Sequence, residues 1–308
     1  MLTEFSLIDR FFKNLPKNPE TRLGIGDDCA LLSIPPGYEL AITTDTMVEG
    51  VHFFVGANPA QVGHKLLAVN LSDLAAMGAT PIAVTLALTL PNVDENWLGE
   101  FSAGFLKLAQ MYNVDLIGGD TTKGALTLTV QAIGLVPWQQ SLKRSTAKVG
   151  DLIYMTGLLG EAGLGLKMMQ GYRCDAENAL VRFHEPIPRI ETGLALRKIA
   201  SACIDISDGL ASDLGHILRQ SGVGATLDFD KLPLSDDVKN YIQNTGDTLM
   251  PLISGDDYEL CFTVPARFAN RVPKNCTAIG IIESESGLRL KKAGQIETLT
   301  EKGYEHFS

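Results

Sequence analysis

The stretch TTDTMVEGVHF, residues 43–53, directly follows the apolar run YELAI of residues 38–42. Threonine favours a pleated strand, so residues 39–44 are predicted to form a strand that ends in hydroxyl and carboxylate oxygens. Asp45 could serve chemistry there, or it could simply cap the turn that follows. A chemical role and a turn cap can be distinguished only if the same arrangement recurs elsewhere in the chain.

Carboxylates beside glycine, serine or threonine do recur, most of them at the boundary of a predicted helix or strand. The stretches are GDD (26–28), TTDT (43–46), NLSD (70–73), GGDTT (118–122), DISDG (205–209) and GDDYEL (255–260). Oxygen donors without clustered cysteine or histidine favour magnesium, manganese or calcium over zinc or copper. The spacing of a calcium-binding loop is absent, which disfavours calcium. Magnesium held by few carboxylates normally shares its coordination with substrate phosphates, so the pattern indicates phosphate chemistry.

Asp73 is the exception, because it falls within a helix predicted over residues 59–77. Val62, Leu66 and Val69 mark an apolar stripe of that helix, and Asp73 lies on the same stripe. A carboxylate on a core-facing stripe is costly to bury unless a partner neutralises it. The partner could be a metal ion or an arginine from elsewhere, or the side chain could reach solvent.

Bulk composition excludes several classes of protein. The chain has 308 residues, 45% of them hydrophobic, a formal net charge of −10 and a pI of about 5.0. A nucleic-acid-binding domain would show a basic stripe, and none is visible. The five cysteines form no CxxC pair and are predicted to be reduced thiols in the cytoplasm. The most apolar stretch, residues 82–90, is too short to cross a bilayer, so no membrane partner is expected.

Two α/β domains of similar size are predicted, residues 1–138 and 139–308, with a polar linker at 139–148. In the first domain, the predicted strands are 39–44, 82–90, 114–117 and 125–136, and the predicted helices are 59–77 and 94–111. The stretch GGDTTKG (118–124) is predicted to connect the last two strands. In the second domain, the predicted strands are 151–156, 203–206, 225–229, 258–264 and 278–282, and the predicted helices are 161–170, 176–184, 189–201 and 209–220.

A phosphate-binding loop of the common kinds is absent from the sequence. Neither a Walker loop nor the protein-kinase signatures are present. The run GLLGEAGLG (157–165) is glycine-rich and opens a predicted helix. Close helix packing explains those glycines at least as well as phosphate binding does.

Six motifs together resemble those of the thiamine-monophosphate kinase family, which belongs to the superfamily of aminoimidazole ribonucleotide synthetase. They are GIGDDCA (24–30), TTDTMVEGVHF (43–53), GHKLLAVNLSDLAAMGA (63–79), GGDTT (118–122), DISDGLASDL (205–214) and GDDYEL (255–260). The motifs stand in the family's order and span almost the whole chain.

The resemblance implies a two-domain synthetase-like fold of the α/β (α+β) class. The N-terminal domain would carry a mixed sheet with helices, bind ATP and magnesium, and pair sheet to sheet in a homodimer. The C-terminal α/β domain would complete the ATP and substrate sites, with ATP held between the two domains.

The resemblance also implies roles for particular residues. The magnesium ligands would be Asp27, Thr43, Thr44, Asp45, Asp73 and Asp120 in the first domain, and Asp205 and Asp208 in the second. ATP would contact Tyr112, Gly119, Asp120, Arg144 and Ser207. Thiamine monophosphate would contact His52, Glu259 and the C-terminal aromatic Phe307. The acidic positions show no departure from the family pattern.

The reaction implied is in-line transfer of the γ-phosphoryl group of ATP to the phosphate of thiamine monophosphate, the final step of thiamine diphosphate biosynthesis. The second pKa of a phosphate monoester is about 6, so the attacking oxygen is largely deprotonated at neutral pH. No catalytic general base is therefore expected. Several magnesium ions would bring two polyanions together in an acidic protein, and positioning plus charge neutralisation would supply the catalysis.

Two other functions are compatible with a fold of this kind. One is another superfamily enzyme, such as a ribonucleotide cyclo-ligase or a selenophosphate synthetase. The latter needs a reactive cysteine or selenocysteine before the first acidic motif, and the first cysteine here is Cys29, inside that motif. The other is a non-catalytic nucleotide or metal sensor, which the full set of acidic residues disfavours.

Overall fold

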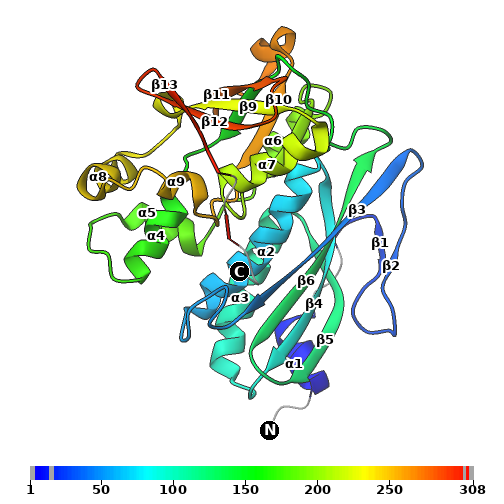
Figure 1. The fold of residues 1–308 in the computed structure, drawn as a ribbon. Coiled ribbons are helices and arrows are strands. Elements are labelled where there is room, and N and C mark those ends of the chain that lie inside the picture. Colours follow the sequence, from blue (N-terminus) through cyan, green and yellow to red (C-terminus); the bar gives the residue numbers. More distant parts are fainter. Residues whose placement is uncertain (1–3, 14–16, 301–302, 305–308) are drawn as a thin grey trace. The chain divides into compact units, whose positions relative to one another are not determined.

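The computed structural model describes residues 4–13, 17–300 and 303–304. The chain forms two compact units (Figure 1). Unit 1 comprises residues 1–74 and 79–139, and unit 2 comprises residues 75–78 and 140–308. Phe307, the predicted C-terminal substrate contact, lies outside the described residues. In the described ranges, no helix combines the length and the apolar character that crossing a membrane requires.

A mixed four-stranded sheet with the order β3-β6-β4-β5 forms the centre of unit 1. β3, β6 and β4 are antiparallel neighbours, whereas β4 and β5 run parallel. The two shortest strands of the unit, β1 and β2, pair in a separate antiparallel ladder. This mixed sheet confirms the fold class predicted for the N-terminal half. The strands are β1 (Thr21–Leu23), β2 (Leu31–Leu32), β3 (Tyr38–Val48), β4 (Thr80–Leu90), β5 (Asp115–Lys123) and β6 (Thr127–Pro137).

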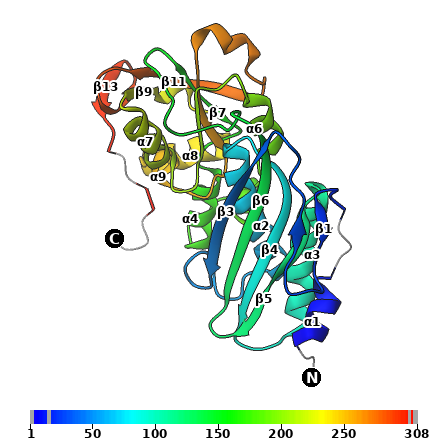
Figure 2. The same ribbon diagram turned by 90° about the vertical axis from the view of Figure 1, so that its right-hand side faces the viewer.

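The helices of this half are α1 (Glu4–Phe11), α2 (Pro59–Ala76) and α3 (Glu95–Met111). α2 and α3 cover one face of the four-stranded sheet (Figures 1 and 2). Glycine brings the two helices into backbone contact, because a Cβ at Gly63 of α2 would overlap the carbonyl of Phe101 on α3. A Cβ at Gly104 of α3 would likewise overlap the carbonyl of Ala60. This close packing fixes α2 against the sheet.

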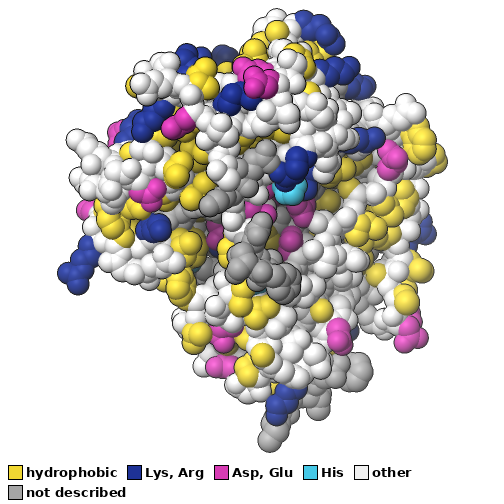
Figure 3. Space-filling view, viewed as in Figure 1, with side chains coloured by type: hydrophobic (Ala, Val, Ile, Leu, Met, Phe, Trp, Pro, Cys, Tyr) yellow, Lys and Arg dark blue, Asp and Glu magenta, His cyan; other side chains and the backbone are white. Residues whose placement is uncertain are grey.

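β3 distributes its side chains over the two faces of the sheet. Thr43, Asp45 and Met47 alternate on the face that α2 covers, and Met47 is only 3% exposed. Leu40 and Ile42, on the other face, are 44% and 57% exposed. Figure 3 shows hydrophobic side chains gathered over the region of unit 1 where β1, β2 and β3 lie. β3 thus presents an exposed apolar row on the side of the sheet away from the helices.

Unit 2 is built on a seven-stranded sheet with the order β13-β12-β9-β11-β7-β10-β8. All neighbours are antiparallel except β9 and β12. The strands are β7 (Leu152–Thr156), β8 (Ala202–Asp205), β9 (Gly224–Asp228), β10 (Leu260–Val264), β11 (Cys276–Glu283), β12 (Gly287–Lys292) and β13 (Gln295–Thr298). The sheet and its helices confirm the α/β class predicted for the C-terminal half.

The helices of unit 2 pack on this sheet through apolar stripes. In α7, the residues Leu210, Leu214, Ile217 and Leu218 are at most 2% exposed and belong to the core. Their spacing places them on one side of the helix. The helices are α4 (Glu161–Met169), α5 (Glu177–His184), α6 (Ile190–Leu196), α7 (Leu210–Ser221), α8 (Asp236–Thr245) and α9 (Met250–Ile253), with 3-10 turns η1 (Phe229–Lys231) and η2 (Ala266–Arg271).

The glycine-rich run at 157–165 serves packing. A Cβ at Gly163 would overlap the Ser254 side chain, so glycine lets α4 approach this neighbour closely. The backbone N–H groups of Gly160 and Ala162, at the start of α4, donate to the carboxylate of Asp257 over 2.9 and 3.3 Å. These donors are used within the protein, which favours the packing interpretation over phosphate binding.

Two predicted segments are wrong, and some elements were not predicted. The predicted connection at 118–124 is a strand, because β5 continues to Lys123 in parallel pairing with β4. Neighbouring strands stabilise extended backbone even at glycines that, in isolation, favour a loop. The helix predicted at 189–201 ends at Leu196. α8 and the β12–β13 hairpin were not predicted, since α8 shows few apolar residues and only its cap, Ser235, marks its start.

Candidate active site

Thr43, Asp45 and Asp73 come together on the sheet face that α2 covers. The hydroxyl of Thr43 on β3 donates a hydrogen bond to the carboxylate of Asp73 on α2. The backbone N–H of Asp45 donates to the side-chain oxygen of Asn70, one turn earlier on α2, over 3.2 Å. The amide of buried Asn70 in turn donates to the Leu66 carbonyl over 3.0 Å. Alternate residues of β3 are thus bonded to one turn of α2.

The surroundings of Asp45 disfavour its negative charge. Burial, and to a smaller extent the neighbouring carboxylate of Asp73, raise the pKa of Asp45 from 3.8 to about 7. A cation bound beside the two carboxylates would oppose this effect. Across the described part of the chain, no three Cys, His, Asp or Glu side chains are arranged to hold a metal ion by themselves. Two carboxylates and a hydroxyl fit a magnesium ion that completes its coordination with water and phosphate oxygens.

Thr44 and Asp120 lie on the opposite face of the sheet. Thr44 is exposed, and it alternates with Thr43 and Asp45 along β3. Asp120 pairs with Ala87 of β4, which pairs in turn with Thr129 of β6, and the Thr129 hydroxyl lies 2.9 Å from the hydroxyl of Thr46 on β3. Ladder partners share a face, so Asp120 is on the side of Thr44 and Thr46.

Asp27 is exposed, and in the sequence it lies apart from the Thr43, Asp45 and Asp73 cluster and from Thr44 and Asp120. Its carboxylate accepts the backbone N–H of Asp28 over 3.3 Å. Of the six magnesium ligands predicted in this half, the structure therefore joins Thr43, Asp45 and Asp73 by contact or electrostatic interaction. The metal-binding role of all six stays a prediction.

Gly119, a predicted ATP contact, occupies a position that only glycine fits. Its φ is +154°, and a Cβ there would overlap the backbone carbonyl of Leu86 on β4. The chain can therefore approach β4 closely just before Asp120. This steric requirement explains the glycine without reference to a ligand, so the ATP contact stays a prediction.

Tyr112 and His52 are held by local hydrogen bonds. Tyr112 caps the C-terminus of α3, and its backbone N–H donates to the Leu108 carbonyl over 3.1 Å. The Nδ1 atom of His52 accepts the backbone N–H of Val48 over 3.0 Å. In the neutral ring the proton then resides on Nε2, which is the atom that could donate to an anionic ligand.

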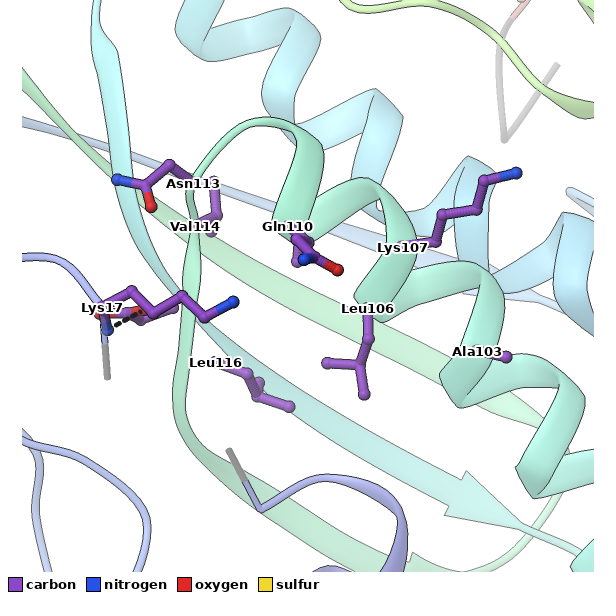
Figure 4. A pocket seen from close by; sticks show the side chains of 10 residues that line it. Lys17, Ala103, Leu106, Lys107, Gln110, Asn113, Val114 and Leu116 are labelled. Atoms are coloured by element: carbon purple, nitrogen blue, oxygen red, sulfur yellow. Dashed lines mark hydrogen bonds between the residues drawn. The ribbon is translucent and has the colours of Figure 1, made fainter. Parts of the chain in front are cut away.

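A pocket in unit 1, with a volume of about 360 Å³, involves none of the predicted residues. It lies between α3 and the start of β5, and Lys17 reaches across it toward Gln110 (Figure 4). Leu106 and Leu116 supply apolar walls. Lys17 and Asn18 are anchored there by their backbone N–H groups, which donate to Asp115 over 2.8 and 2.9 Å.

The acidic loop of unit 2 joins β8 to α7. Asp205, the last residue of β8, is 3% exposed, and Ser207 and Asp208 follow before α7 begins at Leu210. One carboxylate oxygen of Asp213, on the first turn of α7, accepts the backbone N–H groups of Ser207, Asp208 and Gly209. Burial, followed by the nearby Asp208 carboxylate, raises the pKa of Asp213 to about 7. Asp205, Ser207 and Asp208 thus share one loop around a buried acid.

Arg144 lies beside the same strand. The preceding carbonyl, that of Lys143, accepts the backbone N–H of Cys203 on β8 over 3.0 Å. The Arg144 carbonyl accepts the hydroxyl of Ser221 over 3.0 Å, and its side chain is exposed. The backbone is therefore anchored while the guanidinium is accessible, as a phosphate contact requires.

Glu259, a predicted substrate contact, is 4% exposed and already paired. Arg189 donates to both carboxylate oxygens, with one distance of 2.6 Å from Nε, and the Thr156 hydroxyl donates to the same group. A Cβ at Gly157 would overlap this carboxylate. The structure thus shows Glu259 as one partner of a buried ion pair, and its contact with substrate stays a prediction.

The described end of the chain reaches the acidic loop. The backbone N–H of Tyr304 donates to the Asp208 carbonyl over 3.2 Å, and a Cβ at Gly303 would lie 2.6 Å from that carbonyl oxygen. Both contacts lie within unit 2. Phe307, three residues later, is outside the described residues.

The sequence analysis missed two residues that hold the predicted site residues of unit 2 in place. Asp213 is one of them: it is 2% exposed and accepts the backbone N–H groups of Ser207, Asp208 and Gly209, which precede α7. The signal was available, because Asp213 falls on the stripe of Leu210, Leu214 and Ile217. Arg189 gave no such signal, since its partner Glu259 is 70 residues away.

Comparison with known proteins gives a consistent result over the whole chain. Residues 26–136 match the AIR synthase related protein N-terminal domain, and residues 148–288 match the corresponding C-terminal domain. A thiamine-monophosphate kinase of Salmonella typhimurium is 47% identical over 323 residues, an alignment that covers 99% of this chain and 98% of the relative.

Solved structures agree. The crystal structure of a thiamine-monophosphate kinase from Stenotrophomonas maltophilia has a TM-score of 0.83 and 41% identity, covering 89% of this chain and 92% of its own. A structure described as "AaThiL complexed with AMPPCP and TMP" has a TM-score of 0.80 and 32% identity, covering 99% of this chain and 97% of its own.

Proposed function

We infer the function from one premise: this chain belongs to the thiamine-monophosphate kinase family, with both AIR synthase related domains. The chain phosphorylates thiamine monophosphate with ATP, giving thiamine diphosphate and ADP. The observation that carries this conclusion is the 47% identity to a kinase named for that substrate, over 99% of this chain and 98% of the relative. The similarity to a solved relative described as a complex with AMPPCP and TMP supports the same pair of ligands.

We propose that the acidic groups hold magnesium. In unit 1, Asp45 and Asp73 with the Thr43 hydroxyl present clustered hard oxygen donors, and Asp27, Thr44 and Asp120 are the further candidates. In unit 2 the candidates are Asp205 and Asp208. The raised pKa of Asp45 supports this assignment, because two adjacent, partly buried carboxylates need a cation to be fully charged. Bound magnesium would neutralise the phosphates of both substrates.

The remaining predicted residues are proposed to position the substrates. Arg144, exposed on an anchored backbone, would pair with ATP phosphate, and Tyr112, Gly119 and Ser207 would complete the nucleotide contacts. His52, with Nδ1 occupied by the Val48 N–H, would offer Nε2 to thiamine monophosphate. Glu259 and Phe307 complete the proposed substrate contacts.

The chain needs no general base for this reaction. The acceptor is a phosphate whose second pKa is about 6, so it arrives largely deprotonated at neutral pH. The residues of the chain therefore bind and align the two substrates and hold the ions that neutralise their phosphates, and none has to remove a proton. Transfer is proposed to be direct and in line, with catalysis from positioning and electrostatic stabilisation.

A homodimer formed through the unit 1 sheet is proposed as well. Its support is the exposed apolar row on β3, where Tyr38, Leu40 and Ile42 are 43%, 44% and 57% exposed. An apolar row of this kind on a sheet face commonly marks an interface. Ile42→Lys should then convert the dimer to a monomer in analytical ultracentrifugation, whereas Val55→Lys, at a loop residue that is 79% exposed, should not. An Ile42→Lys protein that sediments like the wild type would exclude this interface.

Two finer assignments also remain proposals. Residues 1–138 would supply ATP and magnesium binding and dimerisation, and residues 139–308 would complete the ATP and substrate sites. A cytoplasmic location fits the free cysteines, of which Cys203 and Cys261 are buried.

A coupled assay for ADP tests the proposed function. With thiamine monophosphate and ATP, ADP should form only when magnesium is present. Asp120→Asn should lower turnover by orders of magnitude, because it removes one charge from a magnesium ligand set while keeping the shape of the side chain. Circular dichroism should stay unchanged. Near-normal turnover of Asp120→Asn would exclude Asp120 as a ligand, and absence of ADP from the wild-type protein would exclude the function.

A further inference from the structure

The loop between β8 and α7 carries three proposed ligand contacts within four residues. Asp205 ends the strand, Ser207 and Asp208 follow, and α7 starts at Leu210. Such a short connection leaves the orientation of these side chains to the backbone conformation of Ile206–Gly209. The contacts that fix the backbone of residues 206–209 therefore determine how the Asp205 and Asp208 side chains are oriented.

The side chain of Asp213 holds the backbone of residues 207–209 in place. Its Oδ2 atom accepts hydrogen bonds from the N–H groups of Ser207, Asp208 and Gly209 over 3.0, 3.0 and 3.1 Å. The residue is 2% exposed, so these bonds are shielded from water. A buried N–H group without an acceptor is costly, and one carboxylate here satisfies three of them.

The rest of the loop is held by backbone contacts with the segment at 255–259. The carbonyl of Ser207 accepts the N–H of Asp256, and the carbonyl of Ile206 accepts the N–H of Tyr258, each over 2.8 Å. The N–H of Ile206 donates to the Glu259 carbonyl over 2.8 Å. These bonds use different atoms of the loop from those that Asp213 binds. Asp213 is thus the acceptor for the loop's consecutive N–H groups at 207–209.

The direction of these N–H groups matters for ligand binding. In phosphate-binding loops, consecutive N–H groups before a helix point at the phosphate. Here three of them point at a carboxylate of the protein, so a polyphosphate does not meet them. The loop can contribute to nucleotide binding chiefly through its side chains, two of which are carboxylates.

We propose that Asp213 is a positioning residue: it fixes the 205–209 loop so that Asp205, Ser207 and Asp208 face the metal-bound nucleotide and the loop N–H groups do not. Asp213 touches no ligand in this role. This positioning role rests on the proposed kinase function only for the kinetic measurement that tests it; the hydrogen-exchange measurement does not depend on that function.

The test compares Asp213→Ala, Asp213→Asn and a matched control, Asp151→Ala. Asparagine keeps an acceptor oxygen, whereas alanine leaves three N–H groups without one. Asp151 is also buried in unit 2, and it accepts the Lys148 N–H over 2.9 Å and the Ser201 hydroxyl over 2.5 Å, away from the acidic loop. It therefore reproduces the loss of a buried carboxylate without disturbing residues 205–209.

Hydrogen exchange of the ligand-free protein, measured on peptides that span 204–214, gives the first readout. Asp213→Ala should lose protection there, Asp213→Asn should keep most of it, and Asp151→Ala should match the wild type. The second readout is kinetic: in Asp213→Ala the magnesium concentration for half-maximal rate should rise about tenfold or more, with recovery in Asp213→Asn.

Each result bears on one of the two proposals. Unchanged exchange at 204–214 in a folded Asp213→Ala protein would overturn the positioning role. So would a magnesium requirement that shifts no more than that of Asp151→Ala. A wild-type protein without kinase activity would overturn the proposed function, and the exchange measurement would still decide the role of Asp213. If Asp213→Ala fails to fold, Asp213→Leu takes its place, because leucine fills the buried space and leaves the same three N–H groups without an acceptor: loss of protection at 204–214 supports the proposal and unchanged protection contradicts it.

Discussion

The hydroxyl of Thr43 on β3 donates a hydrogen bond to the carboxylate of Asp73 on α2, 30 residues away in the chain. Asp73 also lies close enough to Asp45 to raise the pKa of that side chain. β3 continues to Val48, beyond the end predicted at residue 44, so Thr43 and Asp45 lie within the strand, where they meet Asp73, the one acid of α2. This contact is the structural basis of the proposed magnesium site in unit 1.

Asp73→Asn should abolish stabilisation by magnesium nucleotide. A ligand that binds only the folded chain raises its melting temperature, and the gain disappears when a ligand atom is lost. A thermal shift titration with magnesium-ADP should therefore show a shift for the wild type and little or none for Asp73→Asn. Asp94→Asn is the matched control, because Asp94 caps α3 away from this cluster and asparagine caps a helix equally well. Equal shifts for Asp73→Asn and the wild type would remove Asp73 from the metal site.

The sequence located this strand and this helix because their signals are local, and the metal-binding role of their residues stays a prediction. The apolar run and threonines of residues 39–44 indicate the strand, and the helical stripe through Asp73 follows from residue spacing. Residue spacing could not show that Asp120 faces away from Asp45, because residues 118–124 were predicted to be a connection and not a strand. Glycine in isolation favours a turn, and only the pairing of β5 with β4 overrides that preference.

The same limit applies to unit 2. Both DISDG and GDDYEL were recognised as acidic boundaries, but their hydrogen bonds to each other depend on β8 and β10 being neighbours. The pairing of Arg189 with Glu259 depends on the same tertiary contacts. Local patterns therefore located the acids, and the fold determined which of them are bonded and which are exposed.

Arg189→Met should destabilise the protein strongly. Glu259 would be left charged, buried and unpaired, a change that typically costs about 3–5 kcal/mol. Replacing both residues, in Arg189→Met with Glu259→Met, should recover much of the loss because no charge then remains buried. Urea unfolding measures the free energy in each case. Arg10→Met, which breaks the exposed pair with Glu95, should cost no more than about 1 kcal/mol. A cost for Arg189→Met as small as that of Arg10→Met would contradict the structural role of this pair.

Asp213 should make the metal-free protein more stable as the pH falls from about 7 to about 4. Its pKa is about 7 in the folded chain and near 3.8 when unfolded, since burial and then Asp208 disfavour its charge. The folded chain therefore binds this proton more tightly, and the gain is complete below the unfolded pKa and lost above the folded one. The slope is at most about 1.4 kcal/mol per pH unit.

Urea unfolding of the wild type and Asp213→Asn in metal-free buffer isolates this contribution. The stability difference, wild type minus variant, should increase between about pH 7.5 and about pH 4.5, because asparagine does not titrate. Parallel pH profiles for the two proteins would show that the Asp213 pKa is not raised.

Acceptor choice tests the central claim, phosphorylation of a phosphate group without a general base. A kinase for free thiamine must take a proton from an alcohol, usually with a positioned carboxylate. Here the acids are assigned to magnesium, and an acceptor without phosphate loses both its nucleophile and its bridge to the metal.

Product formation from thiamine monophosphate and from thiamine, at equal concentration and with excess magnesium-ATP, is therefore the most direct measurement. We predict thiamine diphosphate from the first acceptor and negligible phosphorylation of the second. Comparable phosphorylation of thiamine would contradict the base-free mechanism, together with the assignment of His52 and Glu259 to the phosphorylated substrate.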